Sequence, residues 1–150
     1  MIYFNDLDSS CRIKNCKGVR EWISSVISSR GKKLGDIGVI ICSDDYLLDL
    51  NNQYLNHNYY TDIITFDYTE KDVIGGDLFI SYDRVKENAK KYKETFKKEL
   101  LRIIIHGLLH LIGFLDKTKE EKNTMTLKEN EYLSLYSNLK FHVEHKQQEE

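Results

Sequence analysis

The most apolar stretch of the chain reads LLRIIIHGLLHLIGFL and runs from Leu100 to Leu115. A membrane span needs about 20 mostly apolar residues, and this shorter stretch contains Arg102, His106 and His110. It therefore predicts a buried or half-buried helix of a globular domain. Thr95 is a candidate N-cap before it, and Gly113 is a candidate stop after it. A helix this apolar needs a partner surface, which a β-sheet can supply.

The residues on both sides of this helix predict a sheet and further helices. Runs of β-branched and aromatic residues predict strands over 2–4, 36–42, 62–68 and 75–81. Helical spacing of apolar residues and capping residues predict helices over 19–30, 45–55, 82–92 and 95–113, and a last one that opens at 118 with a capping box. The polar turn between the last two strands predicts an antiparallel hairpin. The expected class is α+β, a small mixed sheet of about four strands with helices packed on it and the apolar helix central.

The composition is that of one ordinary globular domain. The chain has 150 residues, of which 41% are hydrophobic and 31% charged, and it contains no proline. These fractions exclude intrinsic disorder and fibrous proteins. A chain of this length can bury about 70% of its unfolded surface in one core, so we expect a single domain over residues 1–150. The polar end of the chain, 141–150, predicts a frayed tail in which His142 and His145 have no role.

The N-terminus and the cysteines predict a cytoplasmic protein with no membrane partner. Asp6 and Asp8 stand where a signal peptide carries positive charge, and no long apolar region follows them. The cysteines Cys11, Cys16 and Cys42 are odd in number and form no CxxC pair. That usage fits a reducing compartment better than a disulfide framework.

The chemistry of the chain concentrates at the end of the apolar helix. His106 and His110 lie four residues apart, so both imidazoles project from one helix face within reach of one ion. Gly113 lets the chain double back in a left-handed conformation, which brings Asp116 toward the pair as a third ligand. Two imidazoles and a carboxylate leave a tetrahedral zinc ion with one open position for water. That water, acidified by the metal, is the candidate nucleophile or base.

Two other interpretations bear on this pair. A histidine on an apolar helix face is often a core residue whose hydrogen bonds are satisfied, and the bare HxxxH spacing also occurs by chance. Two buried imidazoles without a metal would each need a hydrogen-bond partner, which the surrounding Ile and Leu cannot supply. Zinc peptidases of the HExxH type are disfavoured, because Gly107 stands where they need a general-base Glu.

Four blocks in chain order resemble the YbeY family, metal-dependent bacterial endoribonucleases. His106-Gly-Leu-Leu-His110-Leu-Ile-Gly-Phe is similar to the family's HGxLHLxGY signature, and Thr61-Asp-Ile-Ile-Thr-Phe66 to its TDVLSF strand. Leu50-Asn51 with Tyr54 resembles its LNxxY helix, and Gly76-Asp-Leu-Phe-Ile-Ser81 its GDIxIS strand. The resemblance covers about residues 50–116. It implies a zincin-like arrangement of the central helix and one zinc ion per chain.

The resemblance also implies an activity and partners. These are single-strand-specific cleavage of RNA, maturation of the 16S ribosomal RNA 3′ end, ribosome quality control, and contact with ribosomal RNA and the small subunit. Two positions depart from the family pattern. Asp116 stands where the family usually has its third metal-binding histidine, and Leu55 stands where it carries an arginine after the LNxxY tyrosine. His57 is the candidate to replace that arginine, and the alternative for it is an exposed loop histidine without a role.

A basic segment precedes the metal-binding helix, although the formal net charge of the chain is −2. Residues 82–102 contain eight basic and four acidic side chains, a local charge of +4. Such a segment can hold a phosphate backbone, and the alternative is an ordinary solvated helix face. The candidate RNA-binding residues are Arg84, Lys86, Lys90, Lys91, Lys97 and Lys98.

Three functions therefore stand side by side. The first is the zinc-dependent endoribonuclease with His106, His110 and Asp116 as ligands. The second is a metal-dependent hydrolase of another substrate. The third is a non-catalytic ribosome-assembly factor that keeps a structural metal, an alternative that Leu55 keeps open. A fourth protein ligand would indicate a structural metal site, whereas a water in that position would indicate an enzyme.

Overall fold

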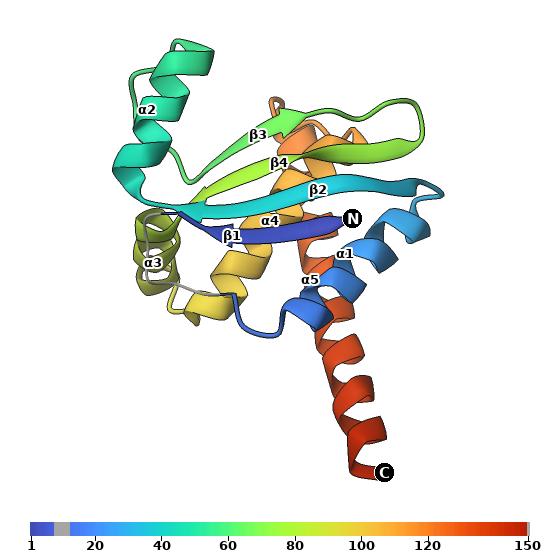
Figure 1. Cartoon of the computed structure of the whole chain (residues 1–150). Helices are drawn as coiled ribbons and strands as arrows, with labels where there is room; N and C mark the ends of the chain where they lie inside the picture. Colours follow the sequence, from blue (N-terminus) through green and yellow to red (C-terminus); the bar gives the residue numbers. More distant parts are fainter. Residues whose placement is uncertain (8–12, 150) are drawn as a thin grey trace.

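The fold is a four-stranded mixed sheet with helices on both of its faces (Figure 1). The structure is a computed structural model that describes residues 1–7 and 13–149, with the backbone alone for 140–149. The strands are β1 (Ile2–Asp6), β2 (Lys33–Cys42), β3 (Ile63–Asp67) and β4 (Val73–Ser81), in the sheet order β1-β2-β4-β3. This confirms the predicted α+β class and the sheet of about four strands.

The strand pairing follows from the connections between the strands. The β1–β2 and β2–β4 pairs are parallel, and helices α1 (Cys16–Ser29) and α2 (Asp44–Leu55) lie in the connections that parallel pairing requires. The short polar turn after β3 lets that strand pair antiparallel with β4, as predicted, in a register that places Ile63 opposite Ile80. This pairing leaves β3 at one edge of the sheet.

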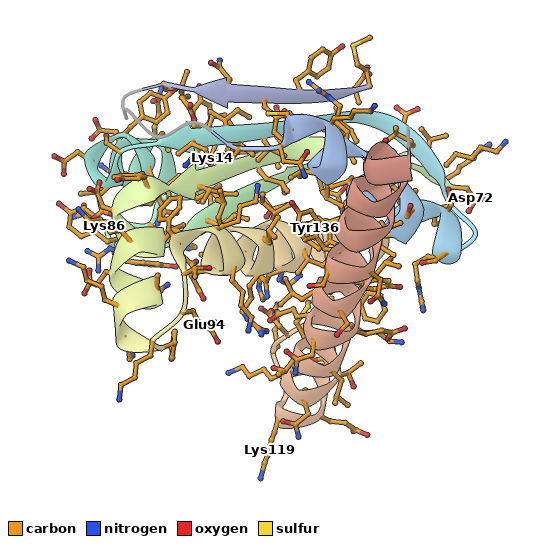
Figure 2. All side chains as sticks on the ribbon, turned by 90° about the horizontal axis from the view of Figure 1, so that it is seen from below. Lys14, Asp72, Lys86, Glu94, Lys119 and Tyr136 are labelled. Carbon is orange, nitrogen blue, oxygen red and sulfur yellow. The ribbon has the colours of Figure 1, made fainter. Side chains whose placement is uncertain are left out.

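One face of the sheet carries the main core. Helices α1, α4 (Phe96–Ile112) and α5 (Lys119–Glu149) cover this face, and α2 rises from the other side (Figure 1). Alternation along the strands sends Leu78 and Ile80 into the main core, whereas Ile64 and Phe79 pack with Leu47 of α2 on the opposite face. Helix α3 (Tyr82–Lys91) flanks α4 on the side away from α5 (Figure 2).

Helix α4 is central, and its caps are the predicted ones. The Thr95 hydroxyl accepts a hydrogen bond from the Lys98 amide at 3.1 Å, and Gly113 ends the helix at φ 117°. Gly107 lets the helix lie close against the sheet, because a Cβ there would lie 2.7 Å from Ile63 Cδ1 and 2.8 Å from Leu78 Cδ2. The residue directly after His106 therefore faces the sheet.

Helix α5 opens with the predicted capping box. The Thr118 amide donates to the Glu121 carboxylate at 2.9 Å, and the Glu121 amide donates to the Thr118 hydroxyl at 3.0 Å. The helix is described as far as Glu149, and the frayed tail over 141–150 stays a prediction. The side chains of His142 and His145 lie outside the described residues, and the single-domain boundary stays a prediction.

Two findings concern the membrane and the thiols. Within residues 1–7 and 13–149, no helix has the length and apolar character needed to cross a membrane. Cys16 and Cys42, the two cysteines within these residues, form no disulfide. Cys11 lies outside them.

Candidate metal centre

The end of α4 brings three potential ligand atoms together. The Nε2 atoms of His106 and His110 lie 3.1 Å apart, one helical turn from each other. An Asp116 carboxylate oxygen lies 3.3 Å from the first Nε2 and 3.2 Å from the second. All three side chains are partly buried. Within the described residues, this is the only group of three His, Cys, Asp or Glu side chains that could hold a metal ion.

The turn after α4 places Asp116 and orients His110. The left-handed Gly113 donates its amide to the carbonyls of Leu109 and His110, and Phe114 donates its amide to Leu109. This turn points the Phe114 carbonyl at His110 Nδ1, 3.0 Å away. A carbonyl can only accept, so Nδ1 carries the hydrogen and the Nε2 of a neutral His110 presents a lone pair.

Glu129 on α5 orients the His106 ring. Its carboxylate oxygen lies 2.8 Å from His106 Nδ1, and its other oxygen accepts a hydrogen bond from Arg102 at 3.0 Å. Arg102 also donates to the Asn130 side chain at 2.9 Å. This carboxylate fixes the orientation of the His106 ring and directs its Nε2 lone pair toward His110 and Asp116.

The converging atoms fit a metal ion. In the neutral imidazoles, each Nδ1 carries the hydrogen and each Nε2 presents a lone pair. The two Nε2 lone pairs and one Asp116 oxygen therefore face each other as three acceptors with no donor among them. A cation relieves that repulsion. Ligand atoms about 2.0–2.1 Å from a tetrahedral ion lie about 3.3–3.4 Å apart, and the three distances here agree to within a few tenths of an ångström.

The pKa of His106 reflects the same surroundings. Burial lowers it, but the hydrogen bond and negative charge of Glu129, together with the charges of Asp116 and Asp62, raise the pKa above its ordinary value. In the absence of a metal ion, the site therefore attracts a proton. Protons and metal ions compete for the same nitrogen atoms.

A cleft of about 600 Å³ borders the centre on the Glu129 side of His106. Carboxylates and the Arg102 guanidinium line much of it, and Tyr92 contributes an aromatic ring. Burial raises the pKa of Asp62 in this cleft, although the nearby His106 opposes the shift. Its principal polar and aromatic lining residues are Asp62, Tyr92, Glu99, Arg102, His106 and Glu129.

The sequence alone did not indicate Glu129 as a residue of the metal centre. The residue lies 23 positions after its partner His106, on a different helix, so no local motif joins them. A signal nevertheless exists in α5, where Met125, Tyr132 and Tyr136 form a buried stripe at helical spacing and Glu129 interrupts it while only 7% exposed. A carboxylate on an apolar stripe needs a partner, and His106 and Arg102 provide it.

His57 and Leu55 lie outside the group of metal-binding candidates. The exposed imidazole of His57 shares a 3.0 Å hydrogen bond with the Tyr59 hydroxyl, and the two rings stack. Leu55 ends α2 with its side chain 42% exposed. The structure thus pairs His57 with a neighbouring tyrosine, and its catalytic role stays a prediction.

The predicted RNA-binding residues fall into two sets. Lys86, labelled in Figure 2, Lys90 and Lys91 are exposed residues of α3, and the Lys91 ammonium lies 5.4 Å from the centre of the Tyr92 ring. Arg84, Lys97 and Lys98 have polar partners within the protein. Arg84 binds Asp44 at 3.0 Å, Lys98 pairs with Glu94 at 3.2 Å, and the Lys97 ammonium contacts the Lys14 carbonyl.

Comparisons with known proteins agree with this architecture. A family model described as endoribonuclease YbeY matches residues 4–137. A protein of Phocaeicola vulgatus named endoribonuclease YbeY is 53% identical over 116 residues, which are 77% of this chain and 84% of that protein. A Flavobacterium psychrophilum protein of the same name is 46% identical over 136 residues, 91% of this chain and 96% of the relative. The solution structure of a Thermotoga maritima protein matches 91% of this chain and 89% of its own, with a TM-score of 0.64 and 29% identity.

Proposed function

The chain belongs to the YbeY family of endoribonucleases, and on that premise we propose that it is a zinc-dependent endoribonuclease that cleaves single-stranded ribosomal RNA. One observation supports the metal dependence most strongly. Two imidazole lone pairs and a carboxylate oxygen converge at 3.1 to 3.3 Å, with both imidazole rings fixed by hydrogen bonds on their far side. Two nitrogen ligands and one oxygen ligand suit zinc and leave one position open.

Each protein group has a defined task in this proposal. His106, His110 and Asp116 would hold the ion. When bound, the ion would supply Lewis-acid stabilisation of phosphoryl charge and would lower the pKa of a water molecule. Glu129 would keep the His106 Nδ1 hydrogen in place, and the Phe114 carbonyl would do so for His110. The carboxylate of Asp116 cancels one unit of metal charge, so we expect less acidification than three histidines would give.

The substrate class rests on the family and on the basic surface. The relatives are named endoribonucleases, and the exposed lysines of α3 give this chain a positively charged face for a phosphate backbone. We propose the 3′ end of 16S ribosomal RNA on the small subunit as the substrate, with roles in its maturation and in ribosome quality control. That substrate would place the activity in the cytoplasm.

The test is cleavage of matched ribosomal RNA fragments, one single-stranded and one annealed to its complement. We expect cleavage of the single strand, little of the duplex, loss of activity with a chelator and recovery with zinc. The chemical ends of the products distinguish attack by water from attack by the ribose 2′-hydroxyl. Equal cleavage of both fragments would contradict the single-strand preference, and cleavage that persists in chelator would contradict the metal dependence.

A second candidate function is favoured by Leu55. A guanidinium at that position could clamp a phosphate, and leucine cannot. The second candidate is therefore a ribosome-assembly factor with a structural metal. It predicts one metal per chain, binding to the small subunit and no cleavage of either fragment. His57→Ala tests the compensating role of His57, and unchanged cleavage in that variant would remove this residue from the site.

A further inference from the structure

Among the described residues that line the cleft beside His106, one carboxylate has no hydrogen-bond donor. Among its acidic residues, Glu129 binds Arg102 and His106, and Glu94 pairs with Lys98. Asp62 accepts hydrogen bonds from its own amide and that of Ile63. Glu99 differs from these residues. Its charge interacts with Arg102, Asp62, Glu129 and Glu94, but no described group donates a hydrogen bond to its carboxylate.

Glu99 is also the least exposed of these acidic residues. The residue is only 5% exposed, and it lines the cleft. The Glu99 oxygens are not among the fully buried polar atoms of the described residues, so they are open to the cleft. A carboxylate that loses part of its water without gaining donors destabilises the folded protein. A ligand that brings N–H donors into the cleft would supply the missing hydrogen bonds. The position of Glu99 is therefore better suited to binding than to stability.

The chemistry of the cleft narrows the class of ligand. A phosphate group would face several carboxylates there, and their repulsion disfavours it. A bare metal ion is disfavoured too, because only His106, His110 and Asp116 bring three ligand atoms within 4.8 Å of one another among the described residues. Nucleobases are neutral and carry N–H donors at their edges. Tyr92, 59% exposed, adds a ring on which a base can stack, and the Lys91 ammonium lies over this ring, 5.4 Å from its centre.

Guanine fits an unpartnered carboxylate better than the other bases do. Its N1–H and N2–H donors lie side by side and match the two oxygens of one carboxylate. Adenine, cytosine and uracil present a donor next to an acceptor at the same edge. Glu99 precedes His106 by about two helical turns, about 10 Å along α4. That distance corresponds to about three stacked nucleotides, and to fewer in an extended strand.

We infer that the cleft is a base-specificity pocket in which Glu99 reads the Watson–Crick edge of an unpaired guanine near the cleaved linkage, with Tyr92 stacking on the base. The inference rests on the proposed endoribonuclease function, whose substrate preference it specifies. It assigns Glu99 the role of a specificity residue and Tyr92 that of a sequence-tolerant stacking platform.

The test uses short single-stranded oligouridylates that carry one guanine at successive positions, and a matched set with inosine, which lacks the N2 amine. Cleavage rate and binding affinity are measured for the wild type, Glu99→Gln and Glu131→Gln. Glu131 is an α5 residue outside the cleft that pairs with Lys128. We expect at least about a fivefold preference for guanine over inosine at one position in the wild type and in Glu131→Gln. Glu99→Gln should lose this preference, because its amide offers one acceptor and one donor.

A second pair of variants protects the test against misfolding of Glu99→Gln. Tyr92→Ala should weaken binding of all the oligomers by about fivefold or more, with the guanine preference retained. Tyr3→Ala, at another exposed tyrosine on β1, should leave binding unchanged. Equal effects of the two tyrosine variants would overturn the stacking role.

The outcomes distinguish failure of the pocket proposal from failure of the nuclease proposal. Cleavage of guanine and inosine oligomers at equal rates, or a guanine preference that survives Glu99→Gln, overturns the pocket and leaves the nuclease proposal intact. A guanine preference in binding that depends on Glu99, with no cleavage by the wild type, supports the pocket and overturns the nuclease proposal.

Discussion

Glu129 connects the two helices of the candidate centre through a single carboxylate. It accepts the His106 Nδ1 hydrogen at 2.8 Å and the Arg102 guanidinium at 3.0 Å. Glu129→Gln removes the charge but keeps the shape. Since an outer carboxylate of this kind raises the basicity of the ligating imidazole, we expect zinc affinity to fall about 10- to 100-fold. Competition with a chromophoric chelator measures this affinity.

Glu131→Gln is the matched control for that change. Glu131 lies on the same helix and pairs with Lys128 at the surface. We therefore expect the zinc affinity of Glu131→Gln to equal that of the wild type. Thermal unfolding of both variants checks that the fold is retained. Wild-type zinc affinity in a folded Glu129→Gln protein would contradict the positioning role of Glu129.

Glu99 gives a prediction for stability against pH. Burial is the main cause that raises its pKa, the neighbouring carboxylates add to it, and Arg102 opposes it. The folded protein therefore holds this proton more tightly than the unfolded chain does, so the contribution of Glu99 to stability is lost as pH rises through the folded-state pKa. We expect Glu99→Gln to raise the free energy of unfolding above that of the wild type at neutral pH. Near pH 4 this increase should be smaller. Urea titrations at both pH values measure this difference, and an equal gain at both would contradict it.

At the scale of the element, α4 carries the site on one face and packs on the sheet with another. Gly107 lies on the packed face, where a Cβ would approach Ile63 and Leu78 to less than 3 Å. Gly107→Glu would complete an HExxH sequence, but its carboxylate would be buried against β3 and β4. We expect a loss of about 3 kcal/mol or more in the free energy of unfolding, with no gain of peptidase activity.

An exposed position supplies the comparison for Gly107→Glu. Leu127 on α5 is 68% exposed, so Leu127→Glu should change the free energy of unfolding by no more than about 0.5 kcal/mol. Urea unfolding measures both variants. A Gly107→Glu protein as stable as Leu127→Glu would show that position 107 does not face the sheet.

Local signals explain which elements could be predicted. The Thr95 cap, the Gly113 stop and the Thr118 capping box are short-range devices, and the structure contains all three. They also brought Asp116 into the predicted group of ligands, because a left-handed Gly113 turns the chain back. The parallel pairing of β1 with β2 and β2 with β4 was not predicted, since it depends on contacts between distant segments. The partnership of Glu129 with His106 was missed for the same reason.

At the scale of the whole molecule, charge is distributed unevenly. The formal net charge is −2, yet the exposed lysines of α3 form a local positive surface near a cleft that is rich in carboxylates. In the proposed complex with RNA, the phosphate backbone would lie at α3 and the base in the cleft. Arg84 on α3 forms an ion pair with Asp44 on α2 and so links these two helices.

The salt dependence of RNA binding tests the basic surface. We expect the triple variant Lys86→Gln, Lys90→Gln, Lys91→Gln to reduce the slope of log affinity against log salt by up to about 2, because each contact to a single strand contributes about 0.7. The control is the triple variant Lys17→Gln, Lys71→Gln, Lys119→Gln, whose positions lie on other elements. It should keep the wild-type slope. Identical slopes for all three proteins would remove α3 from the RNA-binding surface.

We propose that the His106, His110 and Asp116 group holds the metal on which RNA cleavage depends. The most direct measurement is elemental analysis of purified wild type and His110→Ala, combined with the cleavage rate of each sample on one single-stranded ribosomal RNA. We expect about one zinc ion per wild-type chain together with cleavage, and loss of both in a folded His110→Ala protein. Cleavage at the wild-type rate by metal-free His110→Ala would contradict this role of the three residues.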